Sequence, residues 1–286
     1  MWMEPLRALL VQCLLAVAAA LIAKRSKVGA LLLAVAAFAV PPWFAGPVAL
    51  HRGLSALIGF IGCFRVIDVV RVGRSWSPRR RVAHVMSFVD SRTLRPAPRH
   101  LDVRALGRAL AWAAPSVFGI YLTGSSTTFI RWTGALVAVY AGLESAYTLV
   151  GILYRALGFE TPALHVLPLA SSSVGELWGE RWARPVSAWL RETCFRPLAR
   201  RRRPMLGLML GFVVSAIGHA YPVLVATNGS MAALMLAFFV VQGVVVLIET
   251  RIGTAHWWRP AGRLWTVTIM LATSPLFLVP ALRLLD

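Results

Sequence analysis

Long apolar runs separated by short polar connections dominate the chain. Eight of these runs approach the roughly 20 residues that a membrane-spanning helix needs. They lie at 5–23, 28–46, 50–70, 109–124, 129–153, 205–226, 231–249 and 264–284. Pro41, Pro42 and Pro47 fall between the second and third runs, as helix breakers at a turn do. The pattern predicts an all-α integral membrane protein with eight transmembrane helices.

The composition agrees with this fold class. Of the 286 residues, 58% are hydrophobic and 14% are charged, whereas a soluble domain carries about a quarter charged residues. We expect a single polytopic membrane domain over 1–286. Its predicted parts are N-terminal spans within 5–70, a basic segment 71–108, spans within 109–153, interfacial helices within 172–196 and catalytic-core spans within 205–284.

The net charge of +19 suggests a nucleic-acid binder at first sight, but the placement of the basic residues indicates a membrane topology. If the N-terminus lies outside, the segments 24–27, 71–108, 154–204 and 250–263 face the cytoplasm, and they hold 25 of the 30 Lys and Arg residues. Cytoplasmic loops carry such an excess. The bias predicts an N-out and C-out protein that contacts membrane lipid and no nucleic acid, and it leaves room for an anionic substrate.

The polar segment 172–196 differs from the other connections. Ser173 and Glu176 form a capping box, which marks a helix start. Apolar side chains follow at spacings of four and three, on one helical face: Trp178, Trp182, Val186 and Trp189. Pro185 breaks or restarts the helix near Ala183. We expect a pair of short interfacial helices, and a surface helix without chemistry is the plain alternative.

Ionisable side chains within the apolar runs are few, and each is a functional candidate because a charge in the bilayer is costly. Arg65 and Asp68 are three residues apart, so they can pair on one helical face, and we interpret them as structural. Glu144 has no partner nearby in the sequence; it faces a cavity or meets an arginine from another span. Glu249 is expected to pair with Arg251 at the end of its run.

Between Met205 and Ala226, His219 is the only residue among the His, Asp, Glu, Lys and Arg types. It either packs as a hydrogen-bonded core histidine or moves protons, because imidazole can be buried neutral and still accept a proton. The other histidines, at 51, 84, 100, 165 and 256, give no metal-ligand spacing, and no metal site is predicted. No GxSxG nucleophile motif is present either.

Two of these regions together resemble a known family. The stretches "SVGELWGERWA" and "FVVSAIGH" are similar, in this order, to motifs of the membrane-bound O-acyltransferases, specifically the wax-synthase-like branch. The matching residues are Ser173, Glu176, Leu177, Trp178, Gly179, Arg181 and Trp182, then Phe212, Val214, Ser215 and His219. The resemblance runs from about residue 160 to the C-terminus. Where the family usually has Asn, this chain has Ala183, which leaves one polar role without a residue.

The resemblance implies an acyl-CoA-dependent O-acyltransferase that esterifies a lipophilic alcohol, such as a fatty alcohol, a sterol or a terpenoid-type acceptor. It implies acetyl-CoA or long-chain acyl-CoA as co-substrate, no bound cofactor, and His219 as the general base, reached from the cytoplasmic side. Acyl-CoA or substrate contacts are expected from Trp178, Arg181, Trp182, Arg184, Arg191 and Ser215. Polar support is expected from Glu176, Glu180 and Glu144.

Two other functions stay open. A proton-coupled secondary transporter would use Glu144, Asp68 and His219 as a proton path, but transporters usually have two related halves and the sequence shows no internal repeat. The second alternative is a non-catalytic membrane scaffold, for which Ala183 in place of the family's Asn would be a sign that the active site has decayed. A cavity that ends at His219 would favour the enzyme over the scaffold, and alternate opening would favour the transporter. The oligomeric state is not predicted.

Overall fold

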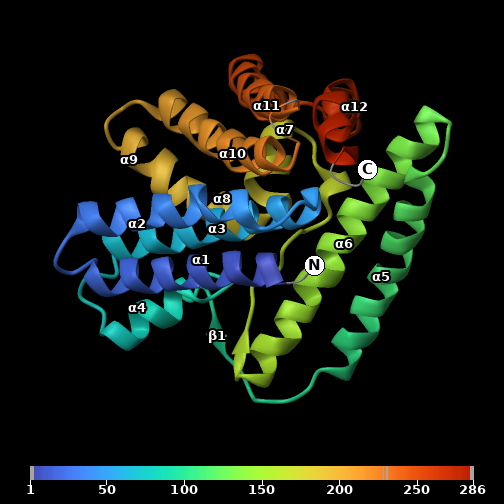
Figure 1. The fold of residues 1–286 in the computed structure, drawn as a ribbon. Coiled ribbons are helices and arrows are strands. Elements are labelled where there is room, and N and C mark those ends of the chain that lie inside the picture. The colour runs from blue at the N-terminus through green and yellow to red at the C-terminus, as the bar shows by residue number, and fades with distance from the viewer. Residues whose placement is uncertain (1–2, 228, 230, 284–286) are drawn as a thin grey trace. The chain divides into compact units, whose positions relative to one another are not determined.

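The computed structural model describes residues 3–227, 229 and 231–283, and these residues are largely helical (Figure 1). Among them, eight helices are long and apolar enough to cross a membrane. They are Met3–Ile22, Lys27–Phe44, Ala49–Arg71, Val103–Thr123, Thr128–Ala156, Pro204–Ala226, Ala232–Ile252 and Arg259–Leu282. Each overlaps one predicted run, although position 284, the last of the final run, lies outside the described residues. The all-α, multi-pass integral membrane fold is confirmed.

The chain divides into two compact units. Unit 1 comprises Met1–Arg92, Ser215–Leu236 and Arg283–Asp286, and unit 2 comprises Thr93–Val214 and Ala237–Leu282. Two of the long helices, α10 (Pro204–Ala226) and α11 (Ala232–Ile252), therefore contribute to both units. The expectation of one membrane domain over 1–286 stays a prediction.

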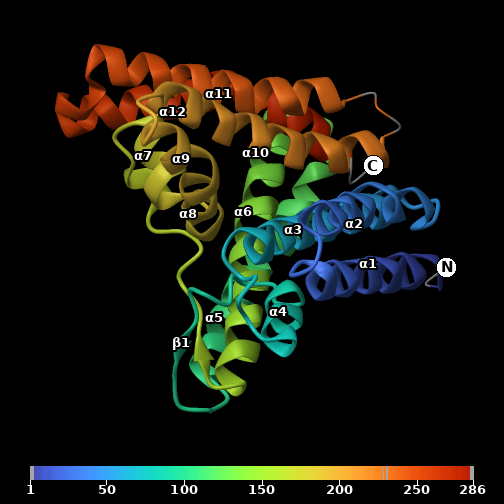
Figure 2. The same ribbon diagram turned by 90° about the vertical axis from the view of Figure 1, so that its left-hand side faces the viewer.

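Unit 1 is built around three helices that lie side by side (Figure 1, Figure 2). Its elements are α1 (Met3–Ile22), α2 (Lys27–Ala39), η1 (Pro41–Phe44), α3 (Ala49–Arg71) and α4 (Pro78–Val85), with parts of α10 and α11. Small and β-branched side chains form the core, among them Ala16, Ala20, Ala30, Val66 and Val69. Small residues let apolar helices approach closely, which is how helices associate in a membrane.

Local sequence explains the bounds of α2. The Ser26 hydroxyl accepts the Gly29 N–H at 2.9 Å, which caps the first turn. Pro41 and Pro42 follow the last residue, Ala39, and the chain turns there through η1, as the prolines predicted. The predicted helix break is confirmed.

A buried amide ties the three helices of unit 1 together. The Gln12 side chain on α1 is 3% exposed and donates to the carbonyl oxygens of Ala37 at 3.3 Å and Ser55 at 2.7 Å. These carbonyls belong to α2 and α3. A polar side chain between apolar helices thus finds its partners on neighbouring helices, as membrane packing requires.

Unit 2 contains a helical hairpin, a set of short helices, the long helix α12 and parts of two further long helices. Its elements are β1 (Arg95–Pro96), α5 (Val103–Thr123), α6 (Thr128–Ala156), β2 (Phe159–Glu160), η2 (Pro168–Ala170), α7 (Val174–Glu176), η3 (Leu177–Arg181), α8 (Arg184–Leu190), η4 (Arg191–Phe195), α9 (Arg196–Ala199), η5 (Thr254–His256) and α12 (Arg259–Leu282), with the remainder of α10 and α11. Strands β1 and β2 form a short antiparallel pair.

Helices α5 and α6 form the hairpin and pack at very short range (Figure 1). A Cβ atom at Gly119 would lie 2.6 Å from the Gly134 carbonyl oxygen, and one at Gly134 would lie 2.7 Å from the Gly119 carbonyl oxygen. The Ser145 hydroxyl on α6 donates to the Ala109 carbonyl on α5 at 2.9 Å. The hairpin therefore depends on glycine at its closest approach.

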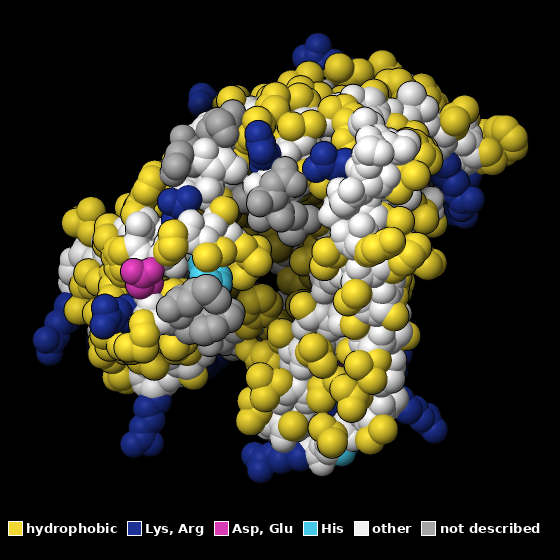
Figure 3. All heavy atoms as spheres, turned by 45° about the vertical axis from the view of Figure 1, so that its right-hand side comes forward, with side chains coloured by type: hydrophobic (Ala, Val, Ile, Leu, Met, Phe, Trp, Pro, Cys, Tyr) yellow, Lys and Arg dark blue, Asp and Glu magenta, His cyan; other side chains and the backbone are white. Residues whose placement is uncertain are grey.

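Apolar side chains also cover the outside of the molecule. In the face drawn in Figure 3, most side chains are hydrophobic, Lys and Arg are scattered over it, and acidic side chains are rare. On α5, for example, Leu110, Val117 and Phe118 are exposed. Such a surface suits contact with lipid tails.

We expect Gly119→Ala to destabilise the protein by roughly 1–3 kcal/mol, because the added methyl group meets backbone that cannot yield without separating the helices. Thermal unfolding in detergent would measure the change. Gly107→Ala is the matched control on the same helix, since a Cβ atom there meets nothing within 4 Å. Equal melting temperatures for the two variants would contradict this account of the hairpin.

Candidate functional site

The candidate residues of the sequence fall into both units. His219 and Ser215 lie on α10 within unit 1. The other candidates belong to unit 2: Glu144, Glu176, Trp178, Glu180, Arg181, Trp182, Arg184 and Arg191. Each group is held by contacts of its own unit.

His219 is partly exposed and hydrogen-bonded to its own helix. Its Nδ1 lies 2.8 Å from the Ser215 carbonyl oxygen, one turn earlier. Because a carbonyl only accepts, Nδ1 is the donor, and in the neutral ring Nε2 is then the unprotonated nitrogen. Ser215 enters this contact through its backbone carbonyl, and the substrate contact expected of Ser215 stays a prediction.

Neighbours in unit 1 fix the part of α10 that carries His219. Gly218 lets the Phe60 ring lie directly against the helix, since a Cβ atom at 218 would be 2.0 Å from that ring. The Tyr221 hydroxyl donates to the Ala39 carbonyl, and Arg52 Nη2 donates to the Ala226 carbonyl at 3.0 Å. The histidine therefore lies on a helix that α2 and α3 hold in place.

The segment with the first motif is not one regular helix. The Ser173 hydroxyl accepts the Glu176 N–H at 2.9 Å, which confirms the predicted helix start. Three residues of α7 pass directly into the π-helical turn η3 (Leu177–Arg181), and the chain then breaks at Trp182 and Ala183. Ala183 has φ +41°, in the left-handed region, and α8 restarts with Pro185 in its first turn. The predicted restart near Ala183 is confirmed.

The predicted single face of Trp178, Trp182, Val186 and Trp189 is wrong. Ala183, between Trp182 and Val186, has a left-handed backbone conformation that interrupts the helix, so the helical spacing does not continue across it. Trp178 donates from Nε1 to Gln242 Oε1 at 3.1 Å and packs against Phe238 and Phe239. Trp182 packs against His165, and the two motif tryptophans also contact each other with ring centroids 6.3 Å apart.

Glu249 anchors the start of this segment. Its carboxylate is 4% exposed and accepts the N–H groups of Val174 at 2.7 Å and Gly175 at 2.8 Å, and the Trp265 indole N–H at 2.8 Å. The expected pair with Arg251 is thus replaced by donors from α7 and α12. A carboxylate at the first turn of a helix satisfies N–H groups that have no partner within the helix.

A second carboxylate holds the motif arginine. Glu176 Oε1 lies 2.6 Å from the Arg181 guanidinium, and Glu176 Oε2 accepts the Ser172 N–H and hydroxyl at 2.7 Å each. Burial alone would raise the pKa of the Glu176 carboxyl, but the hydrogen bonds from Ser172 and the pairing with Arg181 outweigh it, so the pKa lies below its ordinary value. Glu176 supports the fold of the segment, and its expected polar role in the site stays a prediction.

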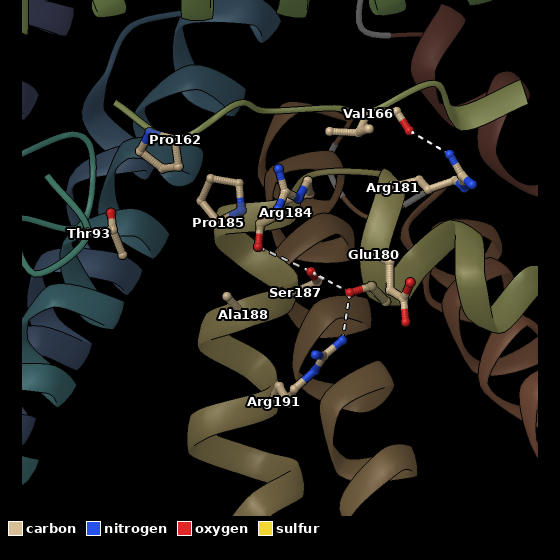
Figure 4. Close-up of a pocket in the computed structure, with 11 residues that line it drawn as sticks. Thr93, Pro162, Val166, Glu180, Arg181, Arg184, Pro185, Ser187, Ala188 and Arg191 are labelled. Atoms are coloured by element: carbon tan, nitrogen blue, oxygen red, sulfur yellow. Dashed lines mark hydrogen bonds between the residues drawn. The ribbon is translucent and has the colours of Figure 1, made fainter. Parts of the chain in front are cut away.

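Arginines of the segment line a cavity of about 520 Å³ in unit 2 (Figure 4). Arg181, Arg184 and Arg191 are all on its wall, together with Glu180 and Ser187. Arg191 Nη2 donates to the Gly179 carbonyl at 2.8 Å, which fixes its guanidinium. Arg181 is balanced by Glu176, and Arg184 and Arg191 outweigh Glu180, so the wall is positively charged. Arginine forks match phosphate and carboxylate oxygens.

The carboxylate of Glu144 is paired with a histidine. The sequence had predicted that it faces a cavity or meets an arginine from another span. His165 Nδ1 lies 2.7 Å from Glu144 Oε1. The histidine comes from the connection between β2 and η2, and its ring lies 4.2 Å from the Trp182 ring. Sequence reasoning overlooked His165, although the cost of a lone carboxylate within an apolar helix indicated that some partner must exist.

A further charged cluster lies at the end of α3 in unit 1. Arg65 and Asp68 pair at 3.7 Å, as predicted, and Asp68, His84 and Asp90 place ligand-type atoms within 4.8 Å of one another. Arg92 Nη2 lies 3.1 Å from Asp68 and 2.7 Å from Asp90, so guanidinium groups already neutralise both carboxylates. Burial would raise the pKa of Asp90, yet Arg92 and Arg65 together lower it. This arrangement favours a structural ion-pair cluster over a metal site.

Comparison with known proteins places plant acyltransferases among the relatives of the chain. Probable long-chain-alcohol O-fatty-acyltransferase 3 of Arabidopsis thaliana is 26% identical over 161 residues, which is 51% of this chain and 47% of that protein. Probable long-chain-alcohol O-fatty-acyltransferase 2 of the same plant is 28% identical over 134 residues, 43% of this chain and 39% of that protein. The matches cover less than half the length of these relatives. No protein-family model matches the chain.

Replacement of Ala183 by glycine should stabilise the protein by up to about 1 kcal/mol, because only glycine adopts positive φ without steric cost. Ala188→Gly is the control, since Ala188 is an exposed residue within α8, where glycine costs roughly 0.5–1 kcal/mol. Thermal unfolding of both variants would test this. A loss of stability in Ala183→Gly would mean that the methyl group makes contacts worth more than the strain.

The Glu176–Arg181 pair should make stability depend on pH. Because the folded protein lowers the pKa of Glu176 from its ordinary value of 4.5, the pair stabilises the fold above that value and is lost as the pH falls through the lowered pKa. The difference in melting temperature between wild type and Glu176→Gln should therefore shrink below pH 4.5. Glu180→Gln, at an exposed residue of the same segment, is the control.

Proposed function

We propose that this protein is an integral-membrane O-acyltransferase of the wax-synthase-like branch of the membrane-bound O-acyltransferases. In this proposal it esterifies the hydroxyl group of a lipophilic alcohol with an acyl group from acyl-CoA. The main support is the likeness of half the chain to plant long-chain-alcohol O-fatty-acyltransferases. The two motifs, in the family's order, point to the same reaction.

His219 is the proposed general base. The contact from Nδ1 to the Ser215 carbonyl sets the tautomer, so that the neutral ring would present Nε2 as a proton acceptor. Its position supports the role, because it lies 15 residues beyond Pro204, roughly 22 Å along an apolar helix at about 1.5 Å per residue. Water is scarce at such a depth, which would suppress hydrolysis of the acyl donor.

In the proposed step, the alcohol oxygen attacks the carbonyl carbon of the thioester while its proton passes to Nε2 of His219. The new C–O bond forms, the C–S bond breaks, and the CoA thiolate takes the proton from the imidazolium as it leaves. The histidine returns to its neutral form and no other reactant is consumed. A base positioned in this way typically contributes about 10²–10⁴ to the rate.

The arginine cavity of unit 2 is the proposed site for the phosphate groups of acyl-CoA. Arg184 and Arg191 would contact phosphate, and Arg181 is already paired with Glu176 and would act through its remaining donors. The excess of basic residues in the connecting segments supports a topology with both termini outside and with this cavity on the cytoplasmic side. Acyl chain length and the exact acceptor alcohol are left open by the proposal.

His219→Ala should abolish ester formation, with a loss of about 10²–10⁴-fold in kcat. The assay incubates purified protein in lipid nanodiscs with radiolabelled acetyl-CoA or palmitoyl-CoA and a pool of lipophilic alcohols. His100→Ala is the control, because His100 is exposed and lies outside the predicted spans. Unchanged activity in folded His219→Ala would remove His219 as the base, and no ester from any alcohol with wild-type protein would contradict the proposed reaction.

A further inference from the structure

The pair of Glu144 and His165 has a role in neither the proposed base nor the arginine cavity. Glu144 lies on α6, one of the eight apolar helices, where an ionised side chain is costly and marks a functional position by default. Its Oε1 atom lies 2.7 Å from Nδ1 of His165. A carboxylate only accepts hydrogen bonds, so Nδ1 carries the proton and the neutral ring has its acceptor at Nε2.

The second ring nitrogen of His165 is buried and has no protein partner. The His165 side chain is 1% exposed, against 19% for Glu144. Its Nε2 atom makes no hydrogen bond to any residue that the structure describes. Buried polar atoms are nearly always hydrogen-bonded, and an exception is expected where a ligand or an ordered water completes the site.

The surroundings prevent His165 from turning towards another partner. Its ring packs against the rings of Trp182, 4.2 Å away, and Tyr140, 5.6 Å away, between ring centroids, and these two rings also contact each other at 5.9 Å. The residues on both sides of His165 are bonded to the motif segment: Arg184 N–H donates to the Leu164 carbonyl and Val166 N–H donates to the Arg181 carbonyl, each at 2.9 Å. Ring and backbone are both held, so Nε2 keeps a fixed direction.

We infer that Nε2 of His165 accepts a hydrogen bond from the hydroxyl group of a lipophilic alcohol, with Glu144 as the positioning residue. The identity of this ligand as the acceptor substrate rests on the proposed function. An acceptor nitrogen requires a donor, which selects a hydroxyl over an ether or an ester oxygen. Two neighbouring aromatic rings and a carboxylate anchored in an apolar helix suit a ligand that arrives from the lipid phase.

Binding of 1-dodecanol tests the site without any reaction, with dodecane as the matched ligand that lacks the hydroxyl. Affinities are measured by thermal stabilisation of the protein in lipid nanodiscs of one composition. In His165→Asn, the amide nitrogen takes the place of Nδ1 and still donates to Glu144, but nothing takes the place of Nε2. The measured quantity is the ratio of the Kd for dodecane to the Kd for dodecanol. We expect this ratio to be about tenfold larger in wild type than in His165→Asn, which corresponds to one buried hydrogen bond.

Dodecanol and dodecane partition differently into lipid, but this difference is the same for wild type and His165→Asn and so drops out of the comparison. A purely structural role for His165 would leave the preference for dodecanol the same in wild type and His165→Asn, and that result would overturn the inference. His165→Gln should recover part of the preference, because its amide reaches the position of Nε2. Dodecyl methyl ether, which has no donor, should bind wild type no better than dodecane; tighter binding would also overturn the inference.

A labelling experiment on wild type covers the case in which His165→Asn does not fold. An alkyl alcohol with a diazirine next to the hydroxyl is cross-linked by light, and the modified peptides are identified by mass spectrometry. Labelling at Tyr140, His165 or Trp182 is expected, and labelling confined to other parts of the chain would overturn the site.

Ester formation separates this inference from the proposed function. If wild type makes ester and His165→Asn raises KM for the alcohol about tenfold with kcat little changed, both stand. If wild type makes no ester but prefers dodecanol through His165, the reaction fails and the hydroxyl site stands. If wild type makes ester and His165→Asn changes neither KM nor the preference for dodecanol, the reaction stands and the inference fails.

Discussion

The acceptance of three N–H groups by the Glu249 carboxylate is the interaction on which the candidate site of unit 2 depends. The motif segment changes from α-helix to π-helix and then breaks within about ten residues, so its own backbone cannot satisfy all of its donors. Glu249 supplies the missing acceptor for Val174 and Gly175 and ties them to Trp265 on α12. Val174 is fully buried, so water could not replace Glu249 as the acceptor of its N–H group.

The same constraint explains the other polar side chains within the apolar helices. Gln12 reaches carbonyl groups of two neighbouring helices, and Glu144 pairs with His165. Each of these side chains makes a specific hydrogen bond to another segment, because no water is available to replace it. Several buried polar atoms of the described residues have no hydrogen-bond partner, and Gln12 Oε1 and Nε2 of His165 are among them. Nε2 of His165 is connected with a ligand because its ring is held by Trp182, Tyr140 and Glu144.

Sequence reasoning was most successful for features with a local cause. The eight spans, the Ser173 cap and the restart at Pro185 all follow from residues a few positions apart, and the structure confirms them. It failed for the shared tryptophan face, because helical spacing assumes one conformation throughout and Ala183 departs from it. It also failed to find the partners of Glu144 and Glu249. His165 lies 21 residues from Glu144, and Val174 lies 75 residues from Glu249.

By itself, the sequence determined that this is a multi-pass helical membrane protein, since hydrophobicity and helix length act within each segment. It also determined a resemblance to the wax-synthase-like acyltransferases and the candidate His219. The tertiary structure alone decided which arginines line one cavity and which histidine meets Glu144. The physical reason is that a buried charge or amide accepts any partner with the right chemistry, and only the packing of distant segments selects one of them.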